Sequence, residues 1–223
     1  MANKAFKTLL QYGDGADPEL FTTLAGVMEI APPSGVSEPV EVTTHDSTKA
    51  EWINTYVDEG EIPITAIFSN DATAAAALAL LGGAASNWQL CFPNWGVGSQ
   101  PEFTSDYDSD DVLDCTAHGL TTGQPVRVAS TTALPAGLSA ATTYYAAYVS
   151  DNELTLHTTN AGAVAGTGTV ELTDDGTGTH TLQVGSRLSM SAIVTAYGLG
   201  PAGLRDALTQ TLTAKITGAV TYT

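Results

Sequence analysis

The sequence predicts a mainly β protein: a β-sandwich core flanked by one α-helix, with a small all-β domain inserted into the core. Threonine and glycine (22 residues) are abundant, and only 14% of the 223 residues are charged; threonine favours strands and glycine favours turns. Several short segments alternate between apolar and polar residues, as half-buried strands do. Apolar residues make up 43% of the chain, which suffices for a buried core and argues against disorder.

The first part of the core reads as strands joined by polar segments. Residues 1–17 have weak periodicity, and we expect an extended arm there. Residues 21–30 predict a strand that a proline pair ends, and residues 40–58 predict a polar loop. Residues 61–69 alternate cleanly between apolar and polar side chains, which predicts a half-buried strand.

The one helix is predicted over residues 72–81. Asn70 or Asp71 can cap its N-terminus, and Asp71 suits the positive end of the helix dipole. The alanine-rich stretch has high helix propensity, with Leu78 and Leu81 on one face. Gly82–Gly83 follows as the stop signal.

A change of composition near Phe103 marks the inserted all-β domain, which we assign to residues 105–185. The acidic run 106–111 near its start resembles a calcium loop, but an EF-hand needs glycine at the sixth position and glutamate at the twelfth. Asp111 and Ala117 stand there, so a solvated acidic loop is predicted. Short predicted strands follow without a helix signal, at residues 126–128, 143–149, 153–158, 170–172 and 179–184.

The core texture returns after the insertion. Residues 188–196 and 208–216 alternate between apolar and polar side chains, and each predicts a half-buried strand. The core domain therefore comprises residues 1–104 and 186–223, interrupted by the inserted domain.

The charge is strongly unbalanced, with 24 acidic and 7 basic residues and a net charge of −17. This argues against a protein that binds nucleic acid through its phosphates. Two interpretations stay open: a surface kept soluble by self-repulsion, or a surface past which DNA slides without sticking. We find no signal peptide, and the most apolar run, residues 74–81, is too short to span a bilayer. We therefore expect synthesis in a cytoplasm and no membrane contact.

The residues predict no catalytic, cofactor-binding or metal-binding constellation. No motif for a nucleophile elbow, a zinc protease or a phosphate loop is present. His118, His157 and His180 in the inserted domain could converge on a metal, but histidine is more often a half-exposed strand residue. Cys91 lies in an apolar strand and reads as a small buried hydrophobe. We therefore expect a protein that is not an enzyme.

The order of the core segments resembles the tail tube (major tail) proteins of long, flexible-tailed phages of the lambda-like group. The resemblance covers residues 1–104 and 186–223. It rests on the strand Phe21–Ile30 with its proline stop, the polar loop Thr43–Ser47, the segment Trp52–Gly60, the strand Ile62–Phe68 before the alanine helix, and the end Leu212–Gly218.

The inserted part resembles a small β-module found in phage structural proteins. It does so through Ala117–Val126, Leu134–Leu138, Tyr144–Tyr145 and Gly176–Leu182, and no activity is implied. The usual lambda-like plan instead places an immunoglobulin-like domain after the core.

The resemblance implies a virion structural protein that assembles in the host bacterial cytoplasm. Six subunits would form a ring, and stacked rings would form the hollow tail tube that conducts DNA into the host. The implied partners are other copies of the chain, a tape-measure protein, and tail terminator and tail tip proteins. DNA would pass through the lumen without specific binding, and no membrane is involved.

Two sets of candidate site residues follow from this interpretation. The polar loop is long enough to reach a neighbouring ring, which makes its residues candidates for an inter-ring contact: Thr44, His45, Asp46, Trp52 and Tyr56. Glu29 and Glu61 lie on or beside predicted strands and are candidates for the lumen, since an acidic wall repels phosphates. The alternative function is a surface- or carbohydrate-binding β-module of a phage fibre or decoration protein.

Overall fold

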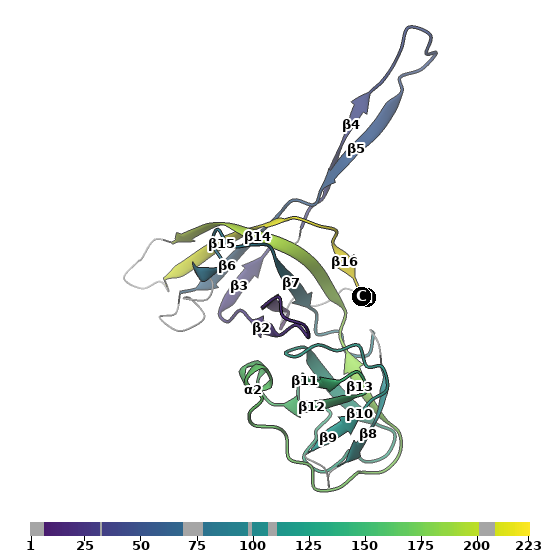
Figure 1. The fold of residues 1–223 in the computed structure, drawn as a ribbon, viewed down its shortest axis with the longest axis vertical. Coiled ribbons are helices and arrows are strands. Elements are labelled where there is room, and N and C mark those ends of the chain that lie inside the picture. Colours follow the sequence, from purple (N-terminus) through teal and green to yellow (C-terminus); the bar gives the residue numbers. More distant parts are fainter. Residues whose placement is uncertain (1–6, 32, 69–77, 98–99, 107–110, 201–207) are drawn as a thin grey trace. The chain divides into compact units, whose positions relative to one another are not determined.

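The computed structural model describes residues 7–31, 33–68, 78–97, 100–106, 111–200 and 208–223. The predicted mainly β class is confirmed: the described residues form a large antiparallel sheet, a separate closed barrel, a two-stranded hairpin and, within the barrel, a short helix (Figure 1). The chain divides into two compact units. One comprises Met1–Leu24, Ser86–Ser189 and Thr221–Thr223, and the other comprises Ala25–Ala85 and Met190–Val220.

The first unit contains three antiparallel strands, β1 (Leu9–Gly13), β2 (Phe21–Thr23) and β7 (Ser86–Cys91), with β1 in the middle. The N-terminal segment is therefore a paired strand where the sequence predicted an extended arm. Leu10 is buried opposite Leu90, and the Tyr12 ring lies 5.9 Å from that of Trp88. Burial of these side chains outweighs the weak periodicity of the segment.

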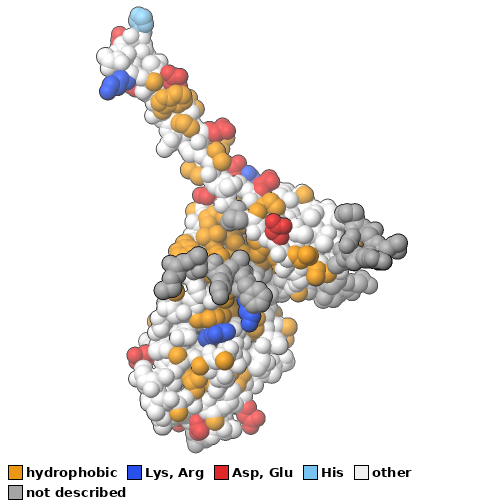
Figure 2. Space-filling view, turned by 180° about the vertical axis from the view of Figure 1, so that it is seen from behind, with side chains coloured by type: hydrophobic (Ala, Val, Ile, Leu, Met, Phe, Trp, Pro, Cys, Tyr) orange, Lys and Arg blue, Asp and Glu red, His pale blue; other side chains and the backbone are white. Residues whose placement is uncertain are grey.

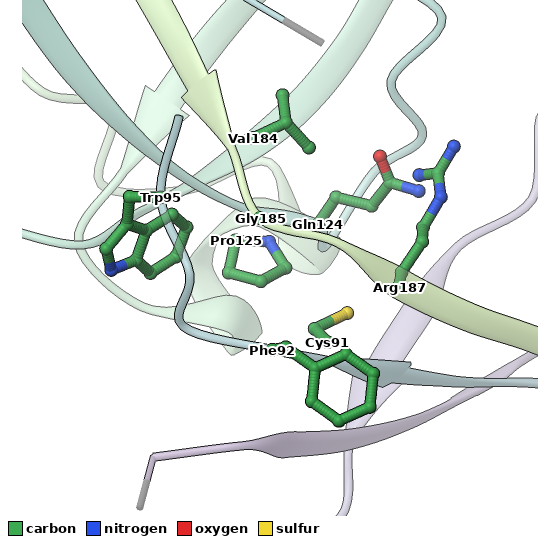
Figure 3. A pocket seen from close by; sticks show the side chains of 8 residues that line it. All are labelled: Cys91, Phe92, Trp95, Gln124, Pro125, Val184, Gly185 and Arg187. Carbon is green, nitrogen blue, oxygen red and sulfur yellow. The ribbon is translucent and has the colours of Figure 1, made fainter. Parts of the chain in front are cut away.

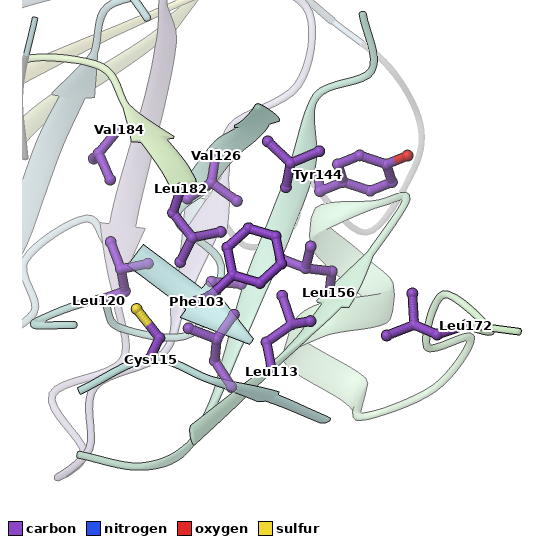
Figure 4. Packing of buried hydrophobic residues seen from close by; sticks show 13 residues of the cluster. Phe103, Leu113, Cys115, Leu120, Val126, Tyr144, Leu156, Leu172, Leu182 and Val184 are labelled. Atoms are coloured by element: carbon purple, nitrogen blue, oxygen red, sulfur yellow. The ribbon is translucent and has the colours of Figure 1, made fainter. Parts of the chain in front are cut away.

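The first unit also contains the closed barrel, with strand order β10-β11-β12-β9-β8-β13. Its strands are β8 (Glu102–Asp106), β9 (Val112–Asp114), β10 (Pro125–Ser130), β11 (Tyr144–Ser150), β12 (Glu153–His157) and β13 (His180–Val184). Figure 4 shows the side chains that fill it, among them Phe103, Leu113, Val126, Leu156 and Leu182. Closure leaves no open sheet edge in the barrel.

One feature of the barrel differs from the prediction of a domain without a helix. A short helix, α2 (Asn160–Ala165), follows β12, and the Thr159 side chain accepts a hydrogen bond from the Gly162 amide at its N-terminus. Predicted strand 170–172 is absent from the described strands. In its place Val170 donates one backbone hydrogen bond to Leu156. The sequence did not predict α2 because six residues behind a capping threonine are too few to show a helical periodicity.

The second unit contains the strands β3 (Val27–Ile30), β6 (Glu61–Ile67) and β15 (Thr209–Ile216), together with most of β14 (Arg187–Leu199). β15 pairs with β14 on one side and β6 on the other, and β6 pairs with β3. The alternation predicted for residues 61–69 is observed. One face of β6 is buried and contains Ile62, Ile64 and Ala66.

The full strand order of the sheet is β2-β1-β7-β14-β15-β6-β3, with β16 (Thr221–Tyr222) pairing with β14. The sequence predicted a sandwich, which has two facing sheets. The described core strands instead form one sheet with this strand order. Predicted strand 21–30 is two strands, because the chain turns at Gly26 (φ +70°), which only glycine adopts readily. The predicted helix 72–81 lies mainly outside the described residues. Leu78 and Ala79 are helical.

The segment predicted as a polar loop is instead an antiparallel hairpin of β4 (Val36–Glu41) and β5 (Trp52–Asp58). Among the described strands, these two pair only with each other (Figure 1). Their residues do not alternate between apolar and polar, which hid the strands from the sequence analysis.

Within the first unit, buried amide side chains tie β1 and β2 to the barrel. Gln11 is fully buried, and its Nε2 donates to the Gly123 carbonyl (2.6 Å) and the Thr23 hydroxyl (3.0 Å). Its Oε1 accepts from Gln89 Nε2 (2.9 Å). Asn160 Nδ2 donates to the Phe21 carbonyl (2.8 Å), and its Oδ1 accepts from the Thr23 amide (2.9 Å). These bonds satisfy the polar groups that the contact buries.

We predict that Gln11→Ala destabilises the protein by about 1–3 kcal/mol, because it leaves the buried Gln89 amide and Gly123 carbonyl without these partners. Gln100→Ala is the matched control, since the exposed Gln100 makes one side-chain bond, to the Gly96 carbonyl, and should change stability by less than about 0.5 kcal/mol. Urea denaturation of both variants measures the difference. Equal losses of stability in the two variants would show that the buried hydrogen bonds of Gln11 stabilise the protein no more than an exposed hydrogen bond does.

Candidate functional site

The three buried histidines of the barrel do not converge. Each ring is instead bonded within its own surroundings: His118 to the Ser150 carbonyl and the Leu120 amide, His157 to the Thr167 carbonyl and Thr155, and His180 to Ser130 and the Asp175 carbonyl. Across the described residues, no group of three or more histidine, cysteine, aspartate or glutamate side chains could hold a metal. We therefore assign these rings to the packing of the barrel.

The two cysteines are buried neutral thiols. Burial raises the pKa of Cys91 to about 12 and the pKa of Cys115 to about 11. The nucleophilic form of cysteine is the thiolate, and these values leave almost none of it at neutral pH. Cys91 Sγ donates to Gln11 Oε1 at 3.3 Å. Neither thiol can therefore act as a nucleophile.

No described helix is long and apolar enough to cross a membrane.

The hairpin exposes an unusual amount of apolar surface. Every residue of β4 and β5 is exposed. The structure has fifteen large exposed hydrophobic side chains in its described part, and seven belong to the hairpin: Val36, Val40, Val42, Trp52, Ile53, Tyr56 and Val57. An isolated two-stranded hairpin is marginally stable in water. Figure 2 shows hydrophobic side chains along the hairpin, interspersed with acidic ones.

Apolar side chains lie on both faces of the hairpin. The register pairs Glu41 with Trp52 and Ser37 with Val57, which puts Trp52 and Val57 on one face. Val40 pairs with Ile53 on the other face. A register shift places Tyr56 at a bulge between them. Exposed apolar side chains on both faces favour a partner surface that covers them.

The predicted inter-ring residues divide into two groups. Thr44, His45 and Asp46 are exposed in the turn that joins β4 and β5, where the Thr44 amide donates to the Ser47 hydroxyl (3.1 Å). Trp52 and Tyr56 are 58% and 66% exposed on β5. The structure therefore brings the five residues onto one hairpin.

Glu29 and Glu61 share the exposed face of the sheet in the second unit. The register pairs Glu29 with Thr65 and Glu61 with Lys215, on the face opposite to the buried Ile62 and Ile64. Threonines of β15 complete this face, which makes it polar and acidic.

One ion pair ties the base of the hairpin to this sheet. Lys215 Nζ lies 2.6 Å from Asp58 Oδ1 and 2.8 Å from Oδ2. The Gly60 amide also donates to Asp58 Oδ1 (2.9 Å). The hydrogen bond from Lys215, followed by that from Gly60, lowers the pKa of Asp58 below its ordinary 3.8.

The first unit contains a groove that the sequence analysis missed. Its volume is about 730 Å³, and its lining includes Lys7, Phe92, Trp95, Arg127, Thr143 and Tyr145. The Arg127 guanidinium lies 5.2 Å from the centre of the Trp95 ring, and its Nε donates to the Thr143 hydroxyl (3.4 Å). The lining comes from distant segments, so no local motif marks it. The signal that the sequence offered was its small number of basic residues, because Lys7 and Arg127, two of the 7, line this groove.

A smaller cavity adjoins this groove and shares Cys91, Phe92, Trp95 and Pro125 with it. Figure 3 shows that Arg187 lies at its side. The Arg187 Nε donates to the Thr223 hydroxyl (3.0 Å), and its buried Nη1 has no hydrogen-bond partner in the described structure. This corner of the first unit is therefore basic and aromatic.

Comparison with known proteins finds similarity in the course of the backbone. No family model matches the chain, and no curated protein matches it. Over its full length it is similar to a chain in the tail of an empty gene transfer agent particle refined with C6 symmetry (12% identity, TM-score 0.47, 99% of that chain). It is also similar to chains in the virion of a native gene transfer agent (11%, 0.46, 99%) and in the baseplate of the anti-feeding prophage (8%, 0.42, 97%), again over all of its own length.

We predict that Lys215→Gln raises the pKa of Asp58 toward 3.8, because the main cause of its lowering is removed. A lowered folded-state pKa stabilises the protein above pH 3.8, and the gain is lost as pH falls through the folded pKa. The stability difference between wild type and Lys215→Gln should therefore close in that acid range. NMR titration of the Asp58 carboxyl group measures the shift. Lys49→Gln, in the hairpin turn, is the control, and an Asp58 pKa that is equal in both variants would contradict the assignment.

Proposed function

We propose that this chain is a structural subunit of the tail tube of a phage-like particle. Six subunits form a ring and the rings stack, as the resemblance of residues 1–104 and 186–223 to tail tube proteins of long flexible tails implies. The observation that carries the proposal is the hairpin, whose two apolar faces have no cover among the described residues of its own chain. Copies of the chain provide that cover.

An open sheet edge supports lateral assembly. β3 ends the strand order and pairs with β6 alone in the described sheet, and Met28 on it is 62% exposed. An unpaired edge is a template for a strand from another chain. A neighbouring subunit in the ring would satisfy the backbone groups of this edge.

The acidic face of the second unit supports a lumen role for Glu29 and Glu61. The second unit has ten acidic and three basic residues by sequence, and the basic Lys215 on this face is bound to Asp58. In the proposed tube, DNA passes along carboxylates, which repel phosphates, and along threonine hydroxyl groups, which carry no charge to attract them. The lumen conducts DNA without specific binding.

The remaining parts of the proposal concern partners and domain roles. A tape-measure protein fills the lumen during assembly, and terminator and tip proteins cover the two ends of the tube. The subunit belongs to the virion tail and assembles in the host cytoplasm. Residues 105–185 form a decoration domain inserted between the two parts of the core, 1–104 and 186–223. The chain has a structural role rather than an enzymatic one.

One observation favours the alternative, a carbohydrate- or surface-binding β-module of a fibre or decoration protein. Trp95 and Tyr145 line the groove of the first unit, and aromatic rings offer flat apolar faces on which a sugar could stack. Binding of glycans by a protein that forms no tubes would support it.

We predict that Trp52→Ser combined with Ile53→Ser abolishes tube formation and leaves the monomer folded, since both side chains are exposed on opposite faces of the hairpin. Negative-stain microscopy and sedimentation of the concentrated protein show tubes, and thermal denaturation shows folding. Val149→Ser, on an exposed barrel position, is the control and should assemble normally. Normal tubes from the double variant would remove the main support of the proposal.

We predict that tubes of Glu29→Lys/Glu61→Gln bind short duplex DNA, with an affinity that falls steeply as salt rises. Glutamine replaces Glu61 because a lysine would face Lys215 in the register. Fluorescence anisotropy of labelled DNA measures binding. Glu171→Lys/Glu153→Gln makes the same charge change on the barrel unit and should leave binding near the wild-type level. DNA binding by the control alone would place the DNA path elsewhere.

A further inference from the structure

Basic residues are scarce in this chain, and three of the five that are described lie around one groove. Of the 7 lysines and arginines in the sequence, Lys7 and Arg127 line the groove of the first unit and Arg187 lines the cavity that adjoins it. Figure 2 shows basic side chains gathered among hydrophobic ones on one face. In a protein of net charge −17, such a cluster marks a place where an acidic partner is attracted and not repelled.

The groove presents Arg127 in a position suited to a carboxylate. Its guanidinium is held by the Trp95 ring and the Thr143 hydroxyl. No carboxylate pairs with Arg127 in the described residues. A guanidinium binds a carboxylate through two parallel hydrogen bonds. Phe92, Pro93 and Tyr145 supply apolar walls beside it.

The hairpin has the complementary chemistry. Glu41 and Trp52 are paired across its strands, so a carboxylate and an indole ring lie side by side on one face. Val57 extends the apolar surface of that face. A volume of about 730 Å³ lies within the roughly 300–1,000 Å³ of pockets that bind a ligand. It suits the side chains of one hairpin face.

We propose that the groove is the docking site for the hairpin of a second copy of this chain. Glu41 of the incoming hairpin pairs with Arg127, and Trp52 of the same hairpin packs against Trp95, Pro93 and Pro125 of the groove. The inference deepens the proposed function and rests on it, because it names the surface that receives the hairpin when rings stack. The hairpin and the groove are different surfaces, so the contact is heterologous, and it repeats along an open stack when the rotation between copies does not close a ring.

A charge exchange between two variants tests this contact. Arg127→Glu alone and Glu41→Arg alone should each raise the critical concentration for tube formation by a factor on the order of ten or more, because each puts like charges together. An equal mixture should assemble again, because the unchanged Glu41 of one variant meets the unchanged Arg127 of the other. The two substituted side chains also meet each other with opposite charges. Rescue by mixing requires a contact between chains.

The hairpin offers a matched control. Glu38 lies on the opposite face from Glu41 by strand alternation, so Glu38→Arg alone, which makes the same charge change, should assemble at the wild-type critical concentration. Thermal denaturation checks that every variant is folded. Should Arg127→Glu fail to fold, disulfide formation between Glu41→Cys and Thr143→Cys chains gives an independent readout, because both native thiols are buried. Cross-linked dimers are expected when the two are mixed.

The outcomes separate the inference from the proposed function. Wild-type tubes together with a failed rescue and no cross-link would overturn the groove as the docking site and leave the tube proposal intact. A wild-type chain that never self-associates would overturn both. Glycan binding that Arg127→Glu abolishes, without any effect on assembly, would assign the groove to the alternative function.

Discussion

The pairing of β15 with β6 is the constraint on which the second unit depends. These strands lie far apart in the chain, yet they pair in register from Thr209 opposite Ile67 to Lys215 opposite Glu61. The inserted barrel lies in the long stretch of chain that this pairing closes. Because the entropy of loop closure grows only slowly with loop length, a sheet of this kind tolerates so large an insertion. The buried row of isoleucine, leucine and alanine side chains on the two strands stabilises the closure.

The same pairing holds the base of the hairpin. Lys215 bonds to Asp58 at the end of β5, and the Ile216 amide donates to the Gly60 carbonyl just beyond it. The end of β5 is therefore fixed to the sheet of its unit, although the strands of the hairpin are exposed. A binding element on a rigid base loses less entropy on docking than a free loop does.

Sequence patterns predicted the strands with one buried face. Residues 61–69 and 208–216 alternate because water lies on one side and the core on the other. The hairpin was missed because both faces carry apolar side chains, so its residues do not alternate between apolar and polar. β1 was missed because Gln11 is polar and fully buried, and its role is visible only with Gln89 and Gly123 in place. The groove was missed because its residues meet only after folding.

The candidate site residues also include some that the sequence placed correctly and some that it missed. The sequence indicated Glu29 and Glu61 as residues on or beside predicted strands, and the structure puts them on one face. It indicated Trp52 and Tyr56 within a loop, and they lie on a strand. Arg127 was not singled out, since an isolated arginine carries no pattern until Trp95 and Thr143 lie beside it.

The difference between hairpin and groove gives any stack built through them a direction. A stack of identical rings would finish at one end with empty basic grooves and at the other with uncovered apolar hairpins. The two ends would then differ in charge, in hydropathy and in solubility. A single kind of cap could not close both: one end calls for an acidic, ribbon-like plug and the other for a basic, aromatic socket.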